Sequence, residues 1–88
     1  MTTYKSVFDA ISDTPLQAAN LKLRAELMQH LQQRIKQMNG SQREIAQQCG
    51  ITQPRLNDLL QGKMSKFSLD ALVNINAQLG EEIELVFV

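Results

Sequence analysis

The segment 41–61, SQREIAQQCGITQPRLNDLLQ, constrains the fold most, because it carries the start and stop signals of two short helices in close succession. Ser41 and Glu44 have the spacing of a capping box, in which each side chain binds the other residue's backbone amide. Gly50 can end that helix in a left-handed conformation. Thr52 can cap a second helix, with Pro54 in its first turn. The segment therefore predicts a helix-turn-helix, whose second helix can enter the major groove of DNA.

The apolar residues of this segment lie where they can fill the angle between the two helices. They are Ile45, Ala46, Ile51, Leu56, Leu59 and Leu60. The residues left to face outward on the second helix are Thr52, Gln53, Pro54, Arg55, Asn57 and Asp58. Gln and Arg side chains can pair with adenine and guanine edges. This pattern favours a DNA-reading helix over an ordinary αα-hairpin with a solvated polar face.

The spacing Gln42-xxx-Ala46-xxx-Gly50-Ile51-Thr52-Gln53-xx-Leu56 resembles the helix-turn-helix of the XRE/Cro family of phage-repressor-like regulators. The stretch 53–80 is similar to small regulators and HigA-type antitoxins, which carry Gly-Lys and then Phe-Ser-Leu after the recognition helix. The resemblance runs from about Ala18 to the C-terminus. It implies an all-α, phage-repressor-like bundle of four to five helices. The sequence has no Ser-His-Asp order, no paired carboxylates and no Gly-rich phosphate loop, so we expect no enzymatic activity and no catalytic residue.

The resemblance also implies how the chain would contact double-stranded DNA. In the family, the matching helix faces base edges, the start of the preceding helix touches phosphate, and the Gly-Lys loop follows the DNA backbone. The base-contacting candidates are Thr52, Gln53, Arg55 and Asn57, and the phosphate-contacting candidates are Ser41, Gln42, Lys63, Ser65 and Lys66. Solubility is the alternative role for the lysines. Pro54, Leu56 and Asn57 differ from the commoner family residues, which leaves the base code open.

The charge distribution fits one DNA-binding face, although the formal net charge is zero. From Leu21 to Phe67 there are eight basic and three acidic residues, whereas Ser68 to Val88 holds four acids and no base. A basic middle and an acidic tail suit a protein that binds DNA on one side only. Chance asymmetry in a short chain is the alternative explanation.

The sequence divides the chain into three predicted parts, of which the last, residues 81–88, is described below. Residues 1–13 form an N-terminal segment, either a short docking helix or a disordered arm, in which Val7, Phe8 and Ile11 share a helical spacing. The helix-turn-helix domain spans residues 14–80. It begins with a long helix from Pro15 to about Met38, where Thr14 is the cap. Its apolar stripe is Ala19, Leu23, Leu27, Leu31, Ile35 and Met38, widened by Leu16, Ala25 and Met28.

A later helix begins at Ser68 as cap and ends at Gly80. Its inward residues are predicted to be Leu72, Val73 and Leu79, with Leu69 and Ile75 at the margin. Phe67, just before the cap, can pack against Leu72 as a hydrophobic staple.

Residues 81–88 alternate polar and apolar side chains, and this pattern predicts a C-terminal β-strand. A lone strand leaves backbone groups unpaired, so we expect it to pair with the same strand of a second copy. The dimerisation candidates are Ile83, Leu85, Val86 and Phe87. A homodimer would place two recognition helices about 34 Å apart on a palindromic operator. Segment 2–7 and a strand of another protein are the alternative partners.

Two function classes therefore remain. The first is a sequence-specific repressor. The second, which rests on the resemblance to HigA-type antitoxins, is a protein that neutralises a small toxin by binding it and represses its own operon. Segment 1–13 is a loose candidate for toxin contact.

Composition narrows the class of protein further. The chain has no 18-residue apolar run and no signal-like N-terminus, so we expect a cytoplasmic protein and no membrane contact. The single Cys49 and single His30 predict no metal site, no disulfide within the chain and no cofactor. We expect Cys49 to be buried and inert, and His30 to be a surface residue.

Overall fold

The computed structural model describes residues 15–84, and the predicted N-terminal segment 1–13 lies outside them. The element order is α2 (Pro15–Lys36), α3 (Gln42–Cys49), α4 (Gln53–Leu60), a 3-10 turn η1 (Met64–Lys66) and α5 (Leu69–Gln78). The described part of the chain is therefore all-helical. Because α3 and α4 match the two predicted short helices, the helix-turn-helix expected from the sequence is present.

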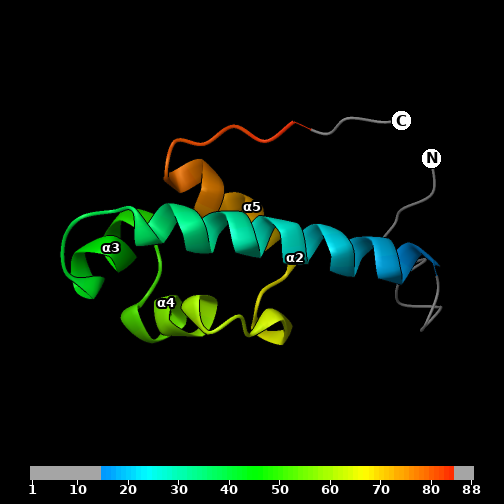
Figure 1. Cartoon of the computed structure of the whole chain (residues 1–88), viewed down its shortest axis with the longest axis horizontal. Coiled ribbons are helices and arrows are strands. Elements are labelled where there is room, and N and C mark those ends of the chain that lie inside the picture. The colour runs from blue at the N-terminus through cyan, green and yellow to red at the C-terminus, as the bar shows by residue number, and fades with distance from the viewer. Residues whose placement is uncertain (1–14, 85–88) are drawn as a thin grey trace.

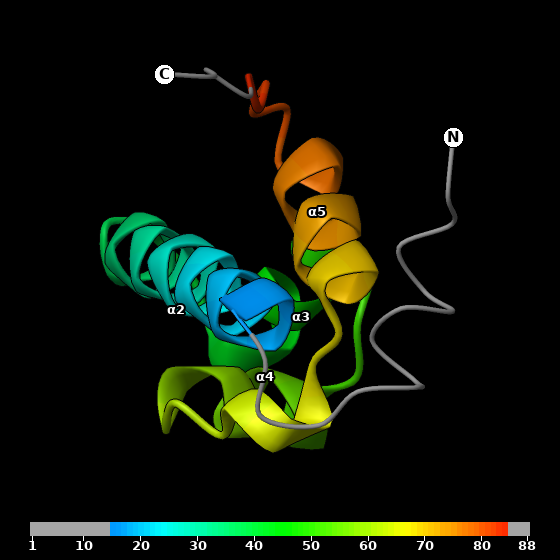
Figure 2. The same cartoon turned by 90° about the vertical axis from the view of Figure 1, so that its right-hand side faces the viewer.

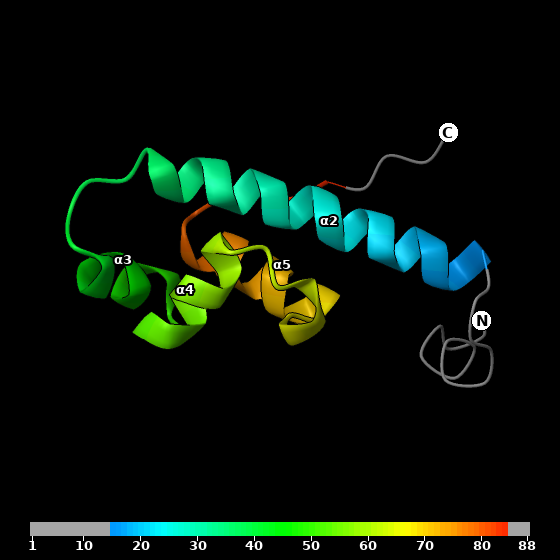
Figure 3. The same cartoon turned by 60° about the horizontal axis from the view of Figure 1, so that its bottom comes forward.

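The long helix α2 spans the length of the molecule, and the shorter elements gather along its C-terminal half (Figures 1 and 3). α2 packs on α5, α4 and η1, while α3 packs on α4 and α5. Viewed along α2, the α4 helix lies at one edge of the molecule and the C-terminal end of α5 at the other (Figure 2). Among residues 15–84, no helix packs on the outer face of α4.

A single core joins these elements. Its apolar members are Met28, Leu31, Ile35, Ile45, Ala46, Cys49, Leu56, Leu59, Phe67, Leu72 and Ile75. Leu31, Leu56, Leu59 and Leu72 have no exposed surface. Ile51, Leu60 and Leu79 pack partly buried against this core, as the sequence predicted for all three.

Helix α2 differs from the prediction at both ends. The helix ends at Lys36, two residues before Met38, because the backbone tightens into a turn there. Leu31 and Ile35 are buried as predicted, but Ala19 and Leu23 are exposed, Leu23 by 38%. The N-terminal part of α2 extends beyond the other helices (Figure 3), so its apolar stripe continues past the core.

The buried face of α5 also needs correction. Ser68 caps the helix as predicted, with its hydroxyl accepting a hydrogen bond from the Ala71 amide at 3.1 Å. Val73 is 37% exposed, whereas Ile75 is buried. The polar Asn76 is also fully buried, where its side-chain amide donates to the Leu72 carbonyl oxygen. The face toward α2 and α3 therefore follows 72, 75, 76 and 79, an i, i+3, i+4, i+7 pattern.

Candidate nucleic-acid interface

The corner between α3 and α4, defined here as residues 49–52, is fixed by backbone geometry. Gly50 has φ of 73°, a left-handed conformation that favours glycine, and its amide donates to the carbonyl oxygens of Ala46 and Gln47. Cys49, directly before it, is buried. Thr52 then caps α4, its hydroxyl accepting from the Arg55 amide at 3.3 Å. These contacts confirm the predicted turn and cap.

α3 starts with the predicted capping box. The Glu44 amide donates to the Ser41 hydroxyl at 3.2 Å, and the Ser41 amide donates to the Glu44 carboxylate at 3.1 Å. The hydrogen bond from the Ser41 backbone, followed by that from its side chain, lowers the pKa of Glu44 below its ordinary value. Ser41 and Gln42 are exposed at this helix start. The start of α3 is thus accessible at the surface, with the Glu44 carboxylate beside it.

The outer face of α4 is polar and open. Thr52, Gln53, Pro54 and Asn57 are exposed, while Leu56 and Leu59 bury the opposite face completely. This division between a buried and an exposed face determines which side chains of α4 can contact another molecule. It presents three side chains able to hydrogen-bond with base edges, from Thr52, Gln53 and Asn57.

Arg55 does not share this open face. Its side chain is half-buried, and its guanidinium carbon lies 4.5 Å from the centre of the Phe67 ring, a cation–π contact. It also lines a cavity of about 250 Å³ between the corner and α5, together with Ile51, Ile75 and Gln78. Two residues apart on a helix, Gln53 and Arg55 lie on nearly opposite sides. The sequence predicted both to face outward; Gln53 is exposed, whereas Arg55 is partly exposed and stacks on Phe67.

The loop after α4, defined here as residues 61–67, carries the lysines predicted to contact phosphate. Lys63 and Lys66 are exposed, and both ammonium groups pair with Asp58 of α4, at 3.4 Å and 3.8 Å. Ser65 is exposed beside them. The loop therefore lies against the C-terminal end of α4, with its positive charge partly paired to an acid of that helix.

Two side chains of α2 hold α4 and the loop in place. Gln32 Nε2 donates to the carbonyl oxygen of Leu59 at 3.0 Å and to that of Leu60 at 3.4 Å. Arg24 Nη1 donates to the carbonyl oxygen of Phe67 at 3.4 Å. Carbonyls in the last turn of a helix lack partners within it, so Gln32 acts as a C-terminal cap from another element. Sequence reasoning missed both residues, since a polar residue within a helix usually faces solvent.

Comparison with protein families gives the same result as this geometry. A family model described as "Helix-turn-helix domain" matches residues 10–87, nearly the whole chain. The chain belongs to this helix-turn-helix domain family. A search of functionally curated proteins finds no match.

Membership of the helix-turn-helix family indicates a DNA-binding regulator, a class that is typically not enzymatic. Within this helix-turn-helix domain, α3 is the first helix, residues 49–52 form the corner, and α4 is the second helix. The loop lysines follow α4 in the chain, and the start of α3 precedes it.

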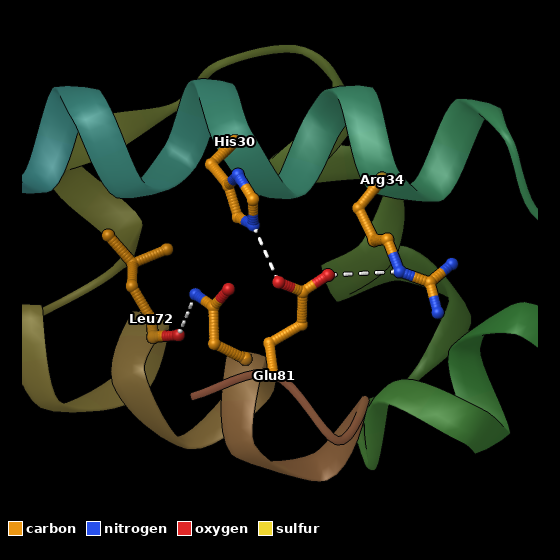
Figure 4. A network of polar contacts seen from close by, with 5 residues as sticks. His30, Arg34, Leu72 and Glu81 are labelled. Carbon is orange, nitrogen blue, oxygen red and sulfur yellow. Dashed lines mark hydrogen bonds and ion pairs between the residues drawn. The ribbon is translucent and has the colours of Figure 1, made fainter. Parts of the chain in front are cut away.

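The segment after α5 is tied back to α2. The Glu81 carboxylate contacts His30 Nε2 at 2.9 Å and accepts from Arg34 Nε at 3.1 Å (Figure 4). The hydrogen bond with His30 is the main cause of a lowered pKa for Glu81, and Arg34 adds to it. His30 is exposed, as predicted.

The predicted strand is only partly covered by the described residues. Residues 81–84 form no strand, and Ile83 is 39% exposed. Leu85, Val86 and Phe87 lie outside the described residues, so strand and dimer stay predictions.

The remaining chemical groups offer no second site in the described range. Burial raises the pKa of the Cys49 thiol, which fits an inert cysteine. Among residues 15–84, no group of three His, Cys, Asp or Glu side chains is placed to hold a metal ion. The same range contains no helix with the length and hydrophobicity to span a membrane.

Proposed function

We propose that this helix-turn-helix protein is a sequence-specific transcriptional repressor that binds a palindromic operator as a homodimer. The observation that carries the proposal is the exposed polar face of α4, at Thr52, Gln53 and Asn57, on a helix whose other face is fully buried. A rigidly packed helix with free side chains capable of base contacts is what major-groove recognition needs.

The base contacts come from Gln53 and Asn57, with Thr52 at the start of the helix. Arg55 has a different part, because its guanidinium is stacked on Phe67 in the free protein. From that position it stabilises the junction of α4 and the loop, and it reaches DNA only after leaving the ring. The phosphate contacts come from Ser41 and Gln42 on one side, and from Lys63, Ser65 and Lys66 on the other.

Fluorescence anisotropy with a duplex from the gene's own upstream region, against a scrambled duplex, tests this assignment. Gln53→Ala should weaken binding to the upstream duplex by about 1–3 kcal/mol and leave scrambled DNA unaffected. Lys63→Gln should weaken both and reduce the salt slope by about one unit. Gln29→Ala, an exposed glutamine of α2, is the matched control and should change neither. Equal loss on both duplexes for Gln53→Ala would exclude base recognition by this residue.

A test of the dimer needs a truncated chain that keeps the contacts of Glu81 with α2. A chain ending after Glu84 keeps the Glu81 contacts with His30 and Arg34 but lacks Leu85, Val86 and Phe87. Sedimentation should show a dimer for the full chain and a monomer for the truncation, which also loses operator affinity. If the full chain binds both duplexes only weakly and salt removes that binding, the antitoxin alternative takes precedence. Co-purification with the product of a neighbouring gene is then the next measurement.

A further inference from the structure

Asp58 is an acidic residue in a place that should disfavour one. It lies in the last turn of α4, where the helix dipole opposes negative charge. It also follows Pro54 by four residues, so both share the outer side of the helix. A carboxylate there would repel the phosphates of any DNA that α4 approaches.

Two lysines from the loop offset this charge. Lys63 Nζ lies 3.4 Å from Asp58 Oδ1, and Lys66 Nζ lies 3.8 Å from Asp58 Oδ2, so each carboxylate oxygen holds one ammonium group. The Lys63 amide also donates to the Asp58 carbonyl oxygen at 3.1 Å. The Asp58 side chain is 22% exposed, against 47% and 55% for the lysines. The acid is thus the inner member of this group, and the lysines cover it.

We propose that Asp58 is a specificity-determining positioning residue, which holds Lys63 and Lys66 in fixed places and withholds part of their charge from DNA of the wrong sequence. The inference rests on the proposed function and deepens it, since it assigns a role to a residue outside the predicted contact set. Asp58, Lys63 and Lys66 are called the lysine clasp below.

The clasp changes how the protein distinguishes DNA sequences. Binding to random DNA depends mainly on phosphate neutralisation, and the clasp presents one net positive charge there instead of two. On the operator, α4 seats in one register, and lysines already held in place meet their phosphates with little loss of side-chain freedom. Because exposed ion pairs are weak, phosphates can displace the carboxylate once the register is correct.

Asp58→Asn in the full chain tests the clasp, since the amide keeps the shape and removes the charge. Glu26→Gln, an exposed acid of α2, makes the same change in net charge elsewhere. At low salt, we expect Asp58→Asn to raise the affinity for scrambled DNA about three- to tenfold and the affinity for the upstream duplex less than about twofold. Specificity, the ratio of the two affinities, therefore falls. Glu26→Gln should leave that ratio unchanged.

A second background separates the clasp from a direct effect of Asp58. In a Lys63→Gln, Lys66→Gln chain, Asp58→Asn should change scrambled-DNA binding no more than Glu26→Gln does. Equal tightening with and without the lysines would overturn the proposal, because Asp58 would then act on phosphate by itself. A selective loss of operator binding in Asp58→Asn would also overturn it, and would mark Asp58 as a base contact.

A measurement without DNA distinguishes failure of the clasp from failure of the proposed function. NMR relaxation of the two lysine ammonium groups should show restricted motion in the wild type and release of both in Asp58→Asn. If the ammonium groups are restricted but the wild type binds neither duplex, the proposed function fails and the specificity role with it. If both groups are already mobile in the wild type, the clasp is wrong whatever the DNA titrations show.

Discussion

The chain enters α4 through the corner, residues 49–52, and leaves it through the loop, residues 61–67, and these two connections are held by different interactions. The corner depends on the left-handed Gly50, the Thr52 cap and the burial of Cys49. The loop depends on side chains from elsewhere, namely Gln32, Arg24, Arg55 and Asp58, placed around the buried Phe67. Backbone geometry sets the angle between α3 and α4. Polar and charged side chains set the position of the loop lysines.

This difference matters for a DNA-binding surface. Backbone hydrogen bonds and apolar packing respond little to ionic strength, so the presentation of α4 should be constant across solution conditions. Exposed charge pairs are screened by salt and exchange partners readily, so phosphate can replace Asp58 as the partner of lysines that already lie in place. The connection before α4 is thus insensitive to salt, whereas the ion pairs of the connection after it can exchange partners.

Phe67→Ala should have the largest effect, because it removes the apolar anchor of the loop. Phe67 is 1% exposed and lies beneath the Arg55 guanidinium. Truncation of a buried phenylalanine costs about 3–5 kcal/mol, a large part of the stability of a small domain. Urea denaturation followed by circular dichroism measures it.

Phe67→Leu separates burial from the contact with Arg55. Leucine keeps most of the apolar volume, so we expect a cost of about 1 kcal/mol, which includes the lost cation–π contact. If Phe67→Ala costs no more than Phe67→Leu, the loop is held mainly by its polar contacts, and the role given to the ring is wrong.

Gly50→Ala should come next, with Gly62→Ala as its counterpart in the loop. Both glycines are left-handed, with φ of 73° and 75°, so each substitution costs about 1–2 kcal/mol of backbone strain. At Gly50 an added Cβ would also lie 3.3 Å from the Gln78 side chain, whereas at Gly62 its nearest neighbour is Gln32 Nε2 at 3.5 Å. We therefore expect the greater loss at the corner.

Thiol labelling of Cys49 provides a local measure of that loss. Cys49 is 2% exposed beside Gly50, so it reacts only when the corner opens. Gly50→Ala should speed the labelling of Cys49 more than Gly62→Ala does, under conditions in which the two variants have the same free energy of unfolding. Identical labelling rates would mean that the corner opens only with the whole domain.

The same contrast explains which features the sequence predicts. The capping box, Gly50, the Thr52 cap and Pro54 act on residues within one turn, so their spacing in the sequence is sufficient to place α3 and α4. Apart from the ion pairs of Asp58, the loop contacts join residues farther apart in the chain. Arg55 faces Phe67 only because α5 brings that ring beneath it, and Gln32 reaches Leu59 only after α2 and α4 have packed. No local pattern encodes such contacts.

The errors on α5 and α2 have related causes. Asn76 is polar and yet fully buried, so it interrupts the apolar pattern of α5. The pattern therefore predicts an inner face that includes Val73 and leaves Ile75 at its margin. On α2 the periodicity continues past the end of the core, where Ala19 and Leu23 have the right spacing but are exposed. Periodicity identifies the face of a helix, but the length of that face that is covered depends on the other elements.

Gln32→Ala should have a smaller effect, confined to the loop side. It removes the hydrogen bonds to the Leu59 and Leu60 carbonyl oxygens and should cost about 1 kcal/mol. Native-state hydrogen exchange should quicken at the Gly62 and Lys63 amides, while the Gly50 and Ile51 amides of the corner remain protected. Gln33→Ala, an exposed neighbour on α2, should change neither group. Faster exchange at the corner would show that the two connections are not independent.

The smallest expected effect concerns Glu44, which begins the helix leading into the corner. Its pKa is lowered from 4.5 by hydrogen bonds from Ser41, so the folded state binds a proton less readily than the unfolded chain. The stabilisation is present above the ordinary pKa and is lost as pH falls through the lowered one. Glutamine at this position can still form the capping box but does not titrate. The urea midpoint of wild type should therefore exceed that of Glu44→Gln at neutral pH, and the difference should shrink on acidification to about pH 3. Glu81, whose pKa is also lowered, is present in both chains, so its contribution to the pH dependence cancels in the difference. A difference that does not change with pH would show that the carboxylate contributes through its shape and not its charge, and this end of the domain would then be as indifferent to charge as the corner itself.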